Sequence, residues 1–181
     1  TQRGPGKLTF NKFNLNATRI QSGFGQKKMK DVIINVDSQF MKESPLKVHW
    51  TFNVLDKTDG FHIKGTILNF NITALYPFTK DHMNASFKGN LEKVFFNFKG
   101  NDKGSAGDFA LQYKDLDVKL YKKKEPKKEN KLTTTVANLV IKDDSNGQTK
   151  NAKVEIEREQ DKSFYNLLWK SIAQGLKKIL I

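Results

Sequence analysis

Strict alternation of apolar and polar residues is the feature that most constrains the fold of this chain. In residues 46–54 an apolar side chain stands at every even position, with Trp50 at the centre. Successive side chains of a β-strand point to opposite faces of a sheet, so this pattern indicates a strand with one buried face. The turn-rich residues 56–60 follow, and the alternation resumes in residues 61–67. This succession predicts a β-hairpin.

The same alternation recurs along most of the 181 residues, and it predicts a mainly β protein of about nine strands separated by turn-forming residues. A change of parity between Phe10 and Phe13 indicates a β-bulge in the first strand. The other expected strands lie near residues 29–36, 94–98, 109–113, 116–120, 132–141 and 152–156. The chain contains 14 Phe and no Cys, so its sheet is expected to have an aromatic apolar face without disulfide bonds.

Two segments depart from the alternation. Residues 122–131 hold six Lys, two Glu and one Pro but no apolar residue, which predicts a solvated loop between two strands. In residues 161–180 apolar residues recur at three- and four-residue spacing, which predicts an amphipathic helix. Asp161 or Ser163 would cap its start. We expect this helix to cover one end of the sheet, in preference to the alternative of lying on a membrane surface.

The net charge of +13 does not by itself indicate a nucleic-acid-binding protein. The positive charge comes from 29 Lys and only three Arg, whereas the guanidinium fork of Arg reads guanine and clamps phosphate. Residues 122–131 alone carry +4 of this charge. The fragment closest to an RNA-recognition signature, Gly23-Phe24-Gly25, lacks the aromatic continuation of that signature. We therefore expect no nucleic-acid partner.

No constellation of catalytic or metal-binding residues is apparent. The three His residues, at positions 49, 62 and 82, are scattered, and the parity of His49 and His62 places them on the solvent side of their strands. Residues 143–147 are better explained as a hairpin turn than as a calcium loop, because the ligand spacing of an EF-hand is missing. We therefore expect a protein that is not an enzyme and that binds no cofactor or metal.

The second half of the chain carries a succession of loose motifs. They are Leu75-x-Pro77 after a strand, Tyr113-x-Asp115-Leu116-x-Val118 in the strand pair that begins at Gly107, and Arg158-x-x-x-Lys162-Ser163-Phe164 followed by Trp169 in the last helix. Residues 60–181 thereby resemble the C-terminal region of AsmA-like envelope proteins of the Bacteroidetes type, which are related to TamB.

This resemblance implies a curled antiparallel sheet with an apolar inner groove, described as β-taco-like, that shields lipid acyl chains between membranes. It also implies a location on the periplasmic side of the bacterial cell envelope and an N-terminal membrane anchor. No run of roughly 20 apolar residues occurs in the chain, and residues 1–6 do not look like a signal peptide. We therefore expect residues 1–181 to be a single β-rich domain from the C-terminal part of a longer protein.

Parity within the strands supplies candidates for the inner face of the sheet, whether that face forms an open groove or half-barrel or closes into a packed core. The groove candidates are Val48, Trp50, Phe52, Ile63, Ile67, Phe96 and Phe98. The candidates on the helix at the groove end are Phe164, Leu168, Trp169, Ile172 and Leu176. Such a groove would hold acyl chains without polar recognition, because each buried methylene contributes about 0.8 kcal/mol.

The expected function is that of a non-enzymatic envelope module that shields or conducts lipid acyl chains in outer-membrane lipid transport or assembly. Its expected partners are phospholipid acyl chains and the membrane. The alternative is a β-rich structural or protein-interaction scaffold of the envelope, without a lipid ligand, whose exposed strand edges pair with a partner chain.

Overall fold

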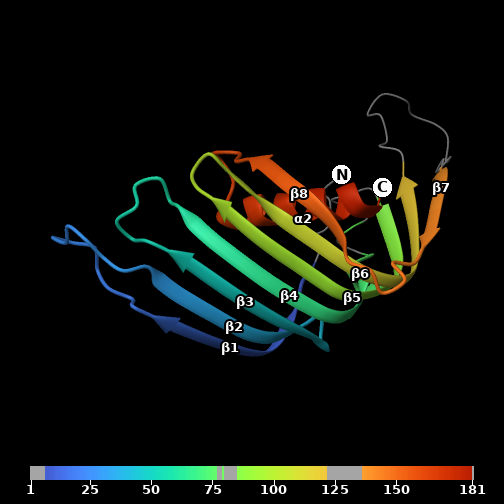
Figure 1. The fold of residues 1–181 in the computed structure, drawn as a ribbon, viewed down its shortest axis with the longest axis horizontal. Coiled ribbons are helices and arrows are strands. Elements are labelled where there is room, and N and C mark those ends of the chain that lie inside the picture. The colour runs from blue at the N-terminus through green and yellow to red at the C-terminus, as the bar shows by residue number, and fades with distance from the viewer. Residues whose placement is uncertain (1–6, 77–78, 80–84, 122–135, 181) are drawn as a thin grey trace.

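The computed structural model describes residues 7–76, 79, 85–121 and 136–180 as one curled sheet with a helix against it (Figure 1). The strands are β1 (Phe10–Thr18), β2 (Val32–Phe40), β3 (Ser44–Phe52), β4 (Phe61–Asn71), β5 (Ala85–Gly100), β6 (Gly104–Tyr121), β7 (Val136–Asp143) and β8 (Lys150–Glu157). A short 3₁₀ helix, η1 (Ile72–Leu75), follows β4, and helix α2 (Phe164–Leu180) comes last. The expected Lys-rich loop at 122–131 lies outside the described residues.

All strand pairs are antiparallel, and β1 to β7 are neighbours in chain order. Strand β8 instead pairs with β6. Within the described residues β1 pairs with β2 alone, so the sheet does not close on itself. The prediction of a mainly β protein with an open, curled antiparallel sheet and a C-terminal helix is thereby confirmed.

Within the described part of the chain the sheet has eight strands rather than about nine, because the two strands expected at 109–113 and 116–120 form one long strand, β6. A bulge opposite Gly89 shifts the register between β5 and β6. Gly89 and Asp115 both have positive φ, of 116° and 52°. The bulge turns Tyr113 and Leu116 inward, and both are buried. The change of parity therefore marks a bulge within one strand.

The bulge expected in the first strand is confirmed. The register of β1 against β2 shifts between Asn11 and Asn14, and Lys12 there has a φ of 47°. Because of this bulge, Phe10 and Leu15 both lie opposite apolar residues of β2, although one has an even and the other an odd number.

The expected hairpin at residues 143–147 is wrong. Strands β7 and β8 do not pair with each other but lie in line along the same edge of β6. The buried Ser145 fills the gap between them: its hydroxyl donates to the carbonyl of Tyr113 at 2.9 Å and accepts from the Tyr113 amide at 3.0 Å. One side chain thereby hydrogen-bonds the β6 backbone where neither strand reaches it.

One face of the sheet is apolar across six strands. The row in register from β2 to β6 and β8 consists of Val36, Val48, Gly65, Phe96, Phe109 and Ala152. Gly65 is required within this row, because a Cβ at that position would lie 2.3 Å from the Phe96 ring. Residues two positions apart on a strand share a face, so this register brings the expected inner residues of β3, β4 and β5 together.

Helix α2 lies along the apolar face, where it packs mainly against β6 and β8. The sequence had instead predicted that this helix covers one end of the sheet. Gly175 allows the close approach, since a Cβ there would lie 2.3 Å from the Phe109 ring. Beside it, the buried hydroxyls of Ser171 and Ser105 are 2.6 Å apart. These contacts hold the helix over the strands.

The other contacts of α2 protect the free edge of β8. The side-chain amide of Gln174 accepts from the Glu155 amide at 2.8 Å and donates to the Glu155 carbonyl at 3.0 Å. The ammonium of Lys178 donates to the Lys153 carbonyl at 2.8 Å. Of the two expected caps, Ser163 precedes the first helical residue, and its carbonyl accepts from the Leu167 amide.

We predict that Gly175→Val lowers the free energy of unfolding by about 1–3 kcal/mol, because the added methyl groups meet the Phe109 ring. Urea denaturation followed by circular dichroism measures the change. Lys177→Ala, an exposed position on the same helix, serves as the control and should stay within about 0.5 kcal/mol of the parent. Equal stability of the Gly175 variant and the parent would contradict the close packing.

Candidate functional site

A cavity of about 270 Å³ lies between the apolar face of the sheet and helix α2. We call it the apolar groove. The residues that line it are Leu8, Phe10, Phe40, Leu46, Val48, Ile63, Ile67, Phe70, Ile72, Leu75, Leu91, Val94, Phe96, Phe109, Tyr165, Leu168, Trp169, Ile172 and Leu176. Its wall is almost entirely carbon, so it offers burial to an apolar group and few hydrogen bonds.

The groove arises because α2 covers only part of the apolar face. Its floor is buried, with Ile63 and Phe96 exposed by 4% and 5%. Its two rims are open: Phe10 on β1 is 48% exposed and Tyr165 on α2 is 73% exposed. Side chains of one continuous face therefore change from packed core beneath the helix to solvent-accessible surface towards β1. The groove opens between these two rims.

Most of the expected inner residues line the groove. On the sheet these are Val48, Ile63, Ile67 and Phe96, and on the helix they are Leu168, Trp169, Ile172 and Leu176. Together they form the floor and one side wall. The four helix residues thus belong to a side wall of the groove, because α2 runs along the face.

Three of the other expected residues form a separate aromatic cluster. The ring of Phe164 stacks on Trp50 with centroids 5.0 Å apart and planes 5° apart. It meets Phe61 edge-on at 5.0 Å, and Phe52 packs against Trp50 at 5.3 Å. We call these four residues the aromatic plug. It joins the first turn of α2 to β3 and β4 and bounds the groove next to Val48 and Ile63.

Phe98 is also not part of the groove wall. It is fully buried and packs against Phe96 with ring centroids 5.6 Å apart. Its partner on β6 is Gly107, where a Cβ would lie 2.9 Å from the Cα of Phe98. Phe98 therefore belongs to the packed core, the alternative that the sequence left open for every inner-face candidate.

Several groove residues were not among the candidates. Leu46 and Val94 share parity with Val48 and Phe96, so the alternation could have identified them. Leu8 shares the parity of Phe10, so it carries the same signal. Ile72 lies in η1, after the end of β4, where a period of two gives no prediction.

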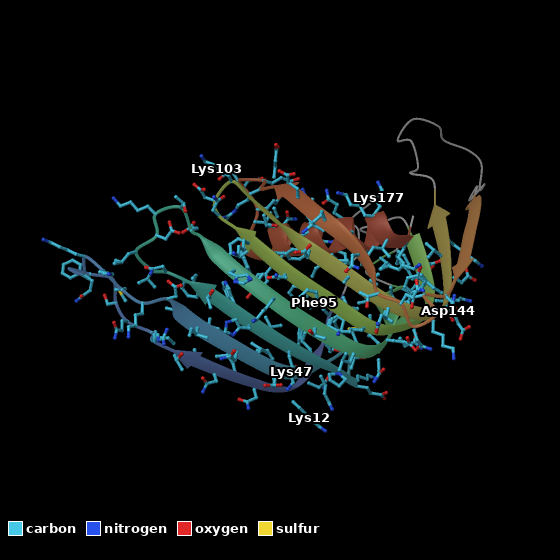
Figure 2. All side chains as sticks on the ribbon, in the orientation of Figure 1. Lys12, Lys47, Phe95, Lys103, Asp144 and Lys177 are labelled. Carbon is cyan, nitrogen blue, oxygen red and sulfur yellow. The ribbon has the colours of Figure 1, made fainter. Side chains whose placement is uncertain are left out.

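The opposite, convex face is polar. His49 and His62 lie on it, as their parity predicts, and each binds the side-chain oxygen of an Asn on the neighbouring strand: Asn35 at 2.7 Å and Asn97 at 2.5 Å. Lys47 pairs with Asp37 at 3.5 Å, and Figure 2 shows it with Lys12 at the β1–β3 side of the sheet. No cluster of potential metal ligands occurs among the described residues.

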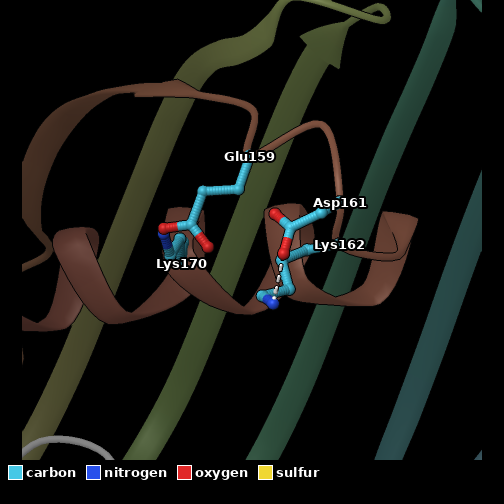
Figure 3. A network of polar contacts seen from close by, with 4 residues as sticks. All are labelled: Glu159, Asp161, Lys162 and Lys170. Atoms are coloured by element: carbon cyan, nitrogen blue, oxygen red, sulfur yellow. Dashed lines mark hydrogen bonds and ion pairs between the residues drawn. The ribbon is translucent and has the colours of Figure 1, made fainter.

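The segment that leads into α2 carries two ion pairs (Figure 3). The carboxylate of Glu159 pairs with Lys170 on the helix. Asp161 pairs with the adjacent Lys162 at 2.5 Å, and this hydrogen bond lowers the pKa of the Asp161 carboxyl and raises the pKa of the Lys162 ammonium. These contacts lie close to Phe164, the residue of α2 that contributes to the aromatic plug.

Comparisons with protein-family models, curated proteins and solved structures found no match to this chain. The resemblance to AsmA-like proteins therefore stays a prediction. In the part of the chain that the structure describes, no helix has the length and apolar character needed to cross a bilayer. We base the functional proposal on the apolar groove.

We predict that Phe164→Ala lowers the free energy of unfolding by about 2–3 kcal/mol, because it removes a half-buried ring and its contacts with the rings of Trp50, Phe61 and Tyr165. The near-ultraviolet circular dichroism of Trp50 should weaken at the same time. Phe24→Ala is the matched control, since Phe24 is 94% exposed. A loss of the same size in both variants would contradict a specific role of the plug.

Proposed function

We propose that the apolar groove binds a lipid acyl chain and that the protein is a non-enzymatic module that shields such chains in the cell envelope. The single observation that carries this proposal is a carbon-lined groove which the side chains of the described residues leave unfilled. Contiguous apolar surface that stays accessible in a folded protein is a mark of ligand-binding grooves and other interaction sites.

The size of the groove suits one alkyl chain. A cavity of ~150 Å³ lined by Leu, Ile and Phe accepts benzene, and the groove here has about 270 Å³. By proportion it accommodates on the order of ten carbon atoms. At about 0.8 kcal/mol for each methylene removed from water, a chain of this length gains several kcal/mol from burial alone.

The shape of the groove also supports an elongated ligand. Its lining extends from Phe40 and Phe70, at one end of β2 and β4, to Val48 and Ile63 beside the aromatic plug. The exposed rims at Phe10 and Tyr165 give the groove an opening along one side. An acyl chain can enter such an opening sideways while its polar headgroup stays in water.

The cellular setting in this proposal comes from the resemblance to AsmA-like proteins. It comprises the periplasmic side of a bacterial envelope, membrane attachment through an N-terminal anchor and a part in outer-membrane lipid transport or assembly. The groove supports lipid binding without reference to this setting, because its chemistry depends only on apolar burial.

We predict that Val48→Phe lowers the affinity for a fluorescent fatty acid by at least about tenfold, because the larger ring occupies space that several methylenes would fill. Leu68→Phe is the matched control: Leu68 follows Ile67 on β4, so it points to the other face, and it is exposed. Fluorescence titration measures both affinities, and circular dichroism verifies that both variants fold.

A second measurement uses the purified chain without added probe. Native mass spectrometry should detect co-purified lipid on the parent and less of it on the Val48 variant. A fatty acid at a concentration ~100 times its Kd should also stabilise the parent by about 2.7 kcal/mol. A parent chain that carries no lipid and binds no probe would overturn the proposal and favour the scaffold alternative.

A further inference from the structure

The loop between β1 and β2, residues 19–31, extends beyond the end of the sheet (Figure 1). We call it the β1–β2 loop. A β-turn forms its tip: the Gln26 amide donates to the Gly23 carbonyl at 3.2 Å, and Gly25 has a φ of +72°. The turn is closed by backbone contacts, so it does not depend on burying the side chain of Phe24.

The β1–β2 loop exposes large apolar side chains. Phe24, in the turn, is 94% exposed, and Ile20 is 70% exposed. Val54 of the adjacent β3–β4 connection is also exposed, and its side chain lies beside Gly23. Exposed Phe and Ile side chains are in contact with water at a free-energy cost, so a surface that removes them from water would bind this loop.

The charge around these apolar residues has one sign. Residues 7–30 contain six cationic residues and no Asp or Glu. Four of the cations are exposed on the loop: Arg19, Lys27, Lys28 and Lys30. Carboxylates occur at its base and in the adjacent β3–β4 connection. They are Asp31, Asp56 and Asp59. The Asp31 carboxylate accepts a hydrogen bond from Asn53. Asp56 accepts hydrogen bonds from Thr58, and these lower the pKa of the Asp56 carboxyl.

The base of the loop is held in place. The side-chain amide of Asn53 donates to the Met29 carbonyl and to the Asp31 carboxylate, both at 3.0 Å. Gly23 packs against Leu55. The β3–β4 connection therefore supports the loop from below and leaves its apolar tip and its cations facing outward.

We propose that the β1–β2 loop docks the protein on an anionic lipid bilayer, with Phe24 and Ile20 inserted at headgroup depth and the four cations against lipid phosphates. Basic residues around apolar side chains are the composition of interfacial membrane-binding segments. A stable protein interface buries on the order of 1,000 Å², whereas a turn tip with two apolar side chains offers much less. A bilayer needs no shape complementarity.

The test is sedimentation of the full chain with vesicles of phosphatidylcholine alone and of phosphatidylcholine mixed with phosphatidylglycerol. The parent should bind the anionic vesicles, and its binding should fall with added salt. The double variant Phe24→Ser, Ile20→Ser should bind at least about tenfold more weakly. Leu68→Ser, which removes an exposed apolar side chain from β4, should bind as the parent does.

Two triple variants test whether vesicle binding requires the cations of the β1–β2 loop. Replacement of Lys27, Lys28 and Lys30 by Gln should weaken binding to anionic vesicles by at least about tenfold, because each cation near the surface contributes on the order of 1 kcal/mol, or roughly fivefold. The same replacement at Lys88, Lys93 and Lys114, which are exposed on β5 and β6, keeps the net charge equal and should have a smaller effect.

Insertion is tested by Phe24→Trp. Its additional fluorescence, compared with that of the parent, should shift to the blue on anionic vesicles and be quenched by brominated acyl chains. Equal binding of the parent and the Phe24, Ile20 variant, or equal effects of the two Lys triplets, would overturn the proposal. The proposal would also be overturned if the parent did not bind vesicles. This includes the outcome in which the loop binds a protein and not a bilayer.

Membrane docking and the apolar groove are tested separately. Val48→Phe lies in the groove and should keep vesicle binding, whereas the Phe24, Ile20 variant should keep its affinity for the fatty-acid probe. Loss of vesicle binding in the Val48 variant would tie docking to the groove and overturn the assignment to the loop.

Discussion

The groove depends on the close contact between α2 and β6. Gly175 lets the helix backbone approach the Phe109 ring, and the paired hydroxyls of Ser171 and Ser105 fill the space beside it. The helix is thereby drawn to the β6–β8 side of an apolar face that extends to β1. A single helix is narrower than this face, about 10 Å with its side chains, so part of the face stays uncovered. The uncovered part and the side of α2 together make the groove.

The same apolar face thus serves two purposes without a change of residue type. Beneath the helix, Phe98 and Val154 are buried, do not line the groove and belong to the core. Towards β1, Val48 and Ile67 stay half-buried although they lie within the sheet. Burial of the first group stabilises the fold, and the accessibility of the second group provides the binding surface. The aromatic plug around Trp50 separates the groove from the end of the sheet that carries the β1–β2 loop.

Much of this organisation follows from local pattern. The alternation predicted a mainly β fold and the residues that share an inner face, and the shift of parity predicted the bulge in β1. The open, curled form of the sheet was implied only by the resemblance to AsmA-like proteins. The long strand β6 was divided in two, because a bulge and a turn produce the same change of parity in a sequence. The relation of β7 to β8 was also wrong, since the gap between them is filled by Ser145 binding the backbone of Tyr113, a contact that no periodicity encodes.

The sequence by itself determined which side chains face inward, because a strand alternates its faces with a period of two and a helix gathers its apolar residues at three- and four-residue spacing. Only the tertiary structure decided which inward residues are core and which are groove. Phe98 and Ile63 alternate alike, yet one lies in the core and the other lines the groove. The difference arises from where α2 lies, and this position is set by contacts between residues such as Ser105 and Ser171, which are far apart in the chain.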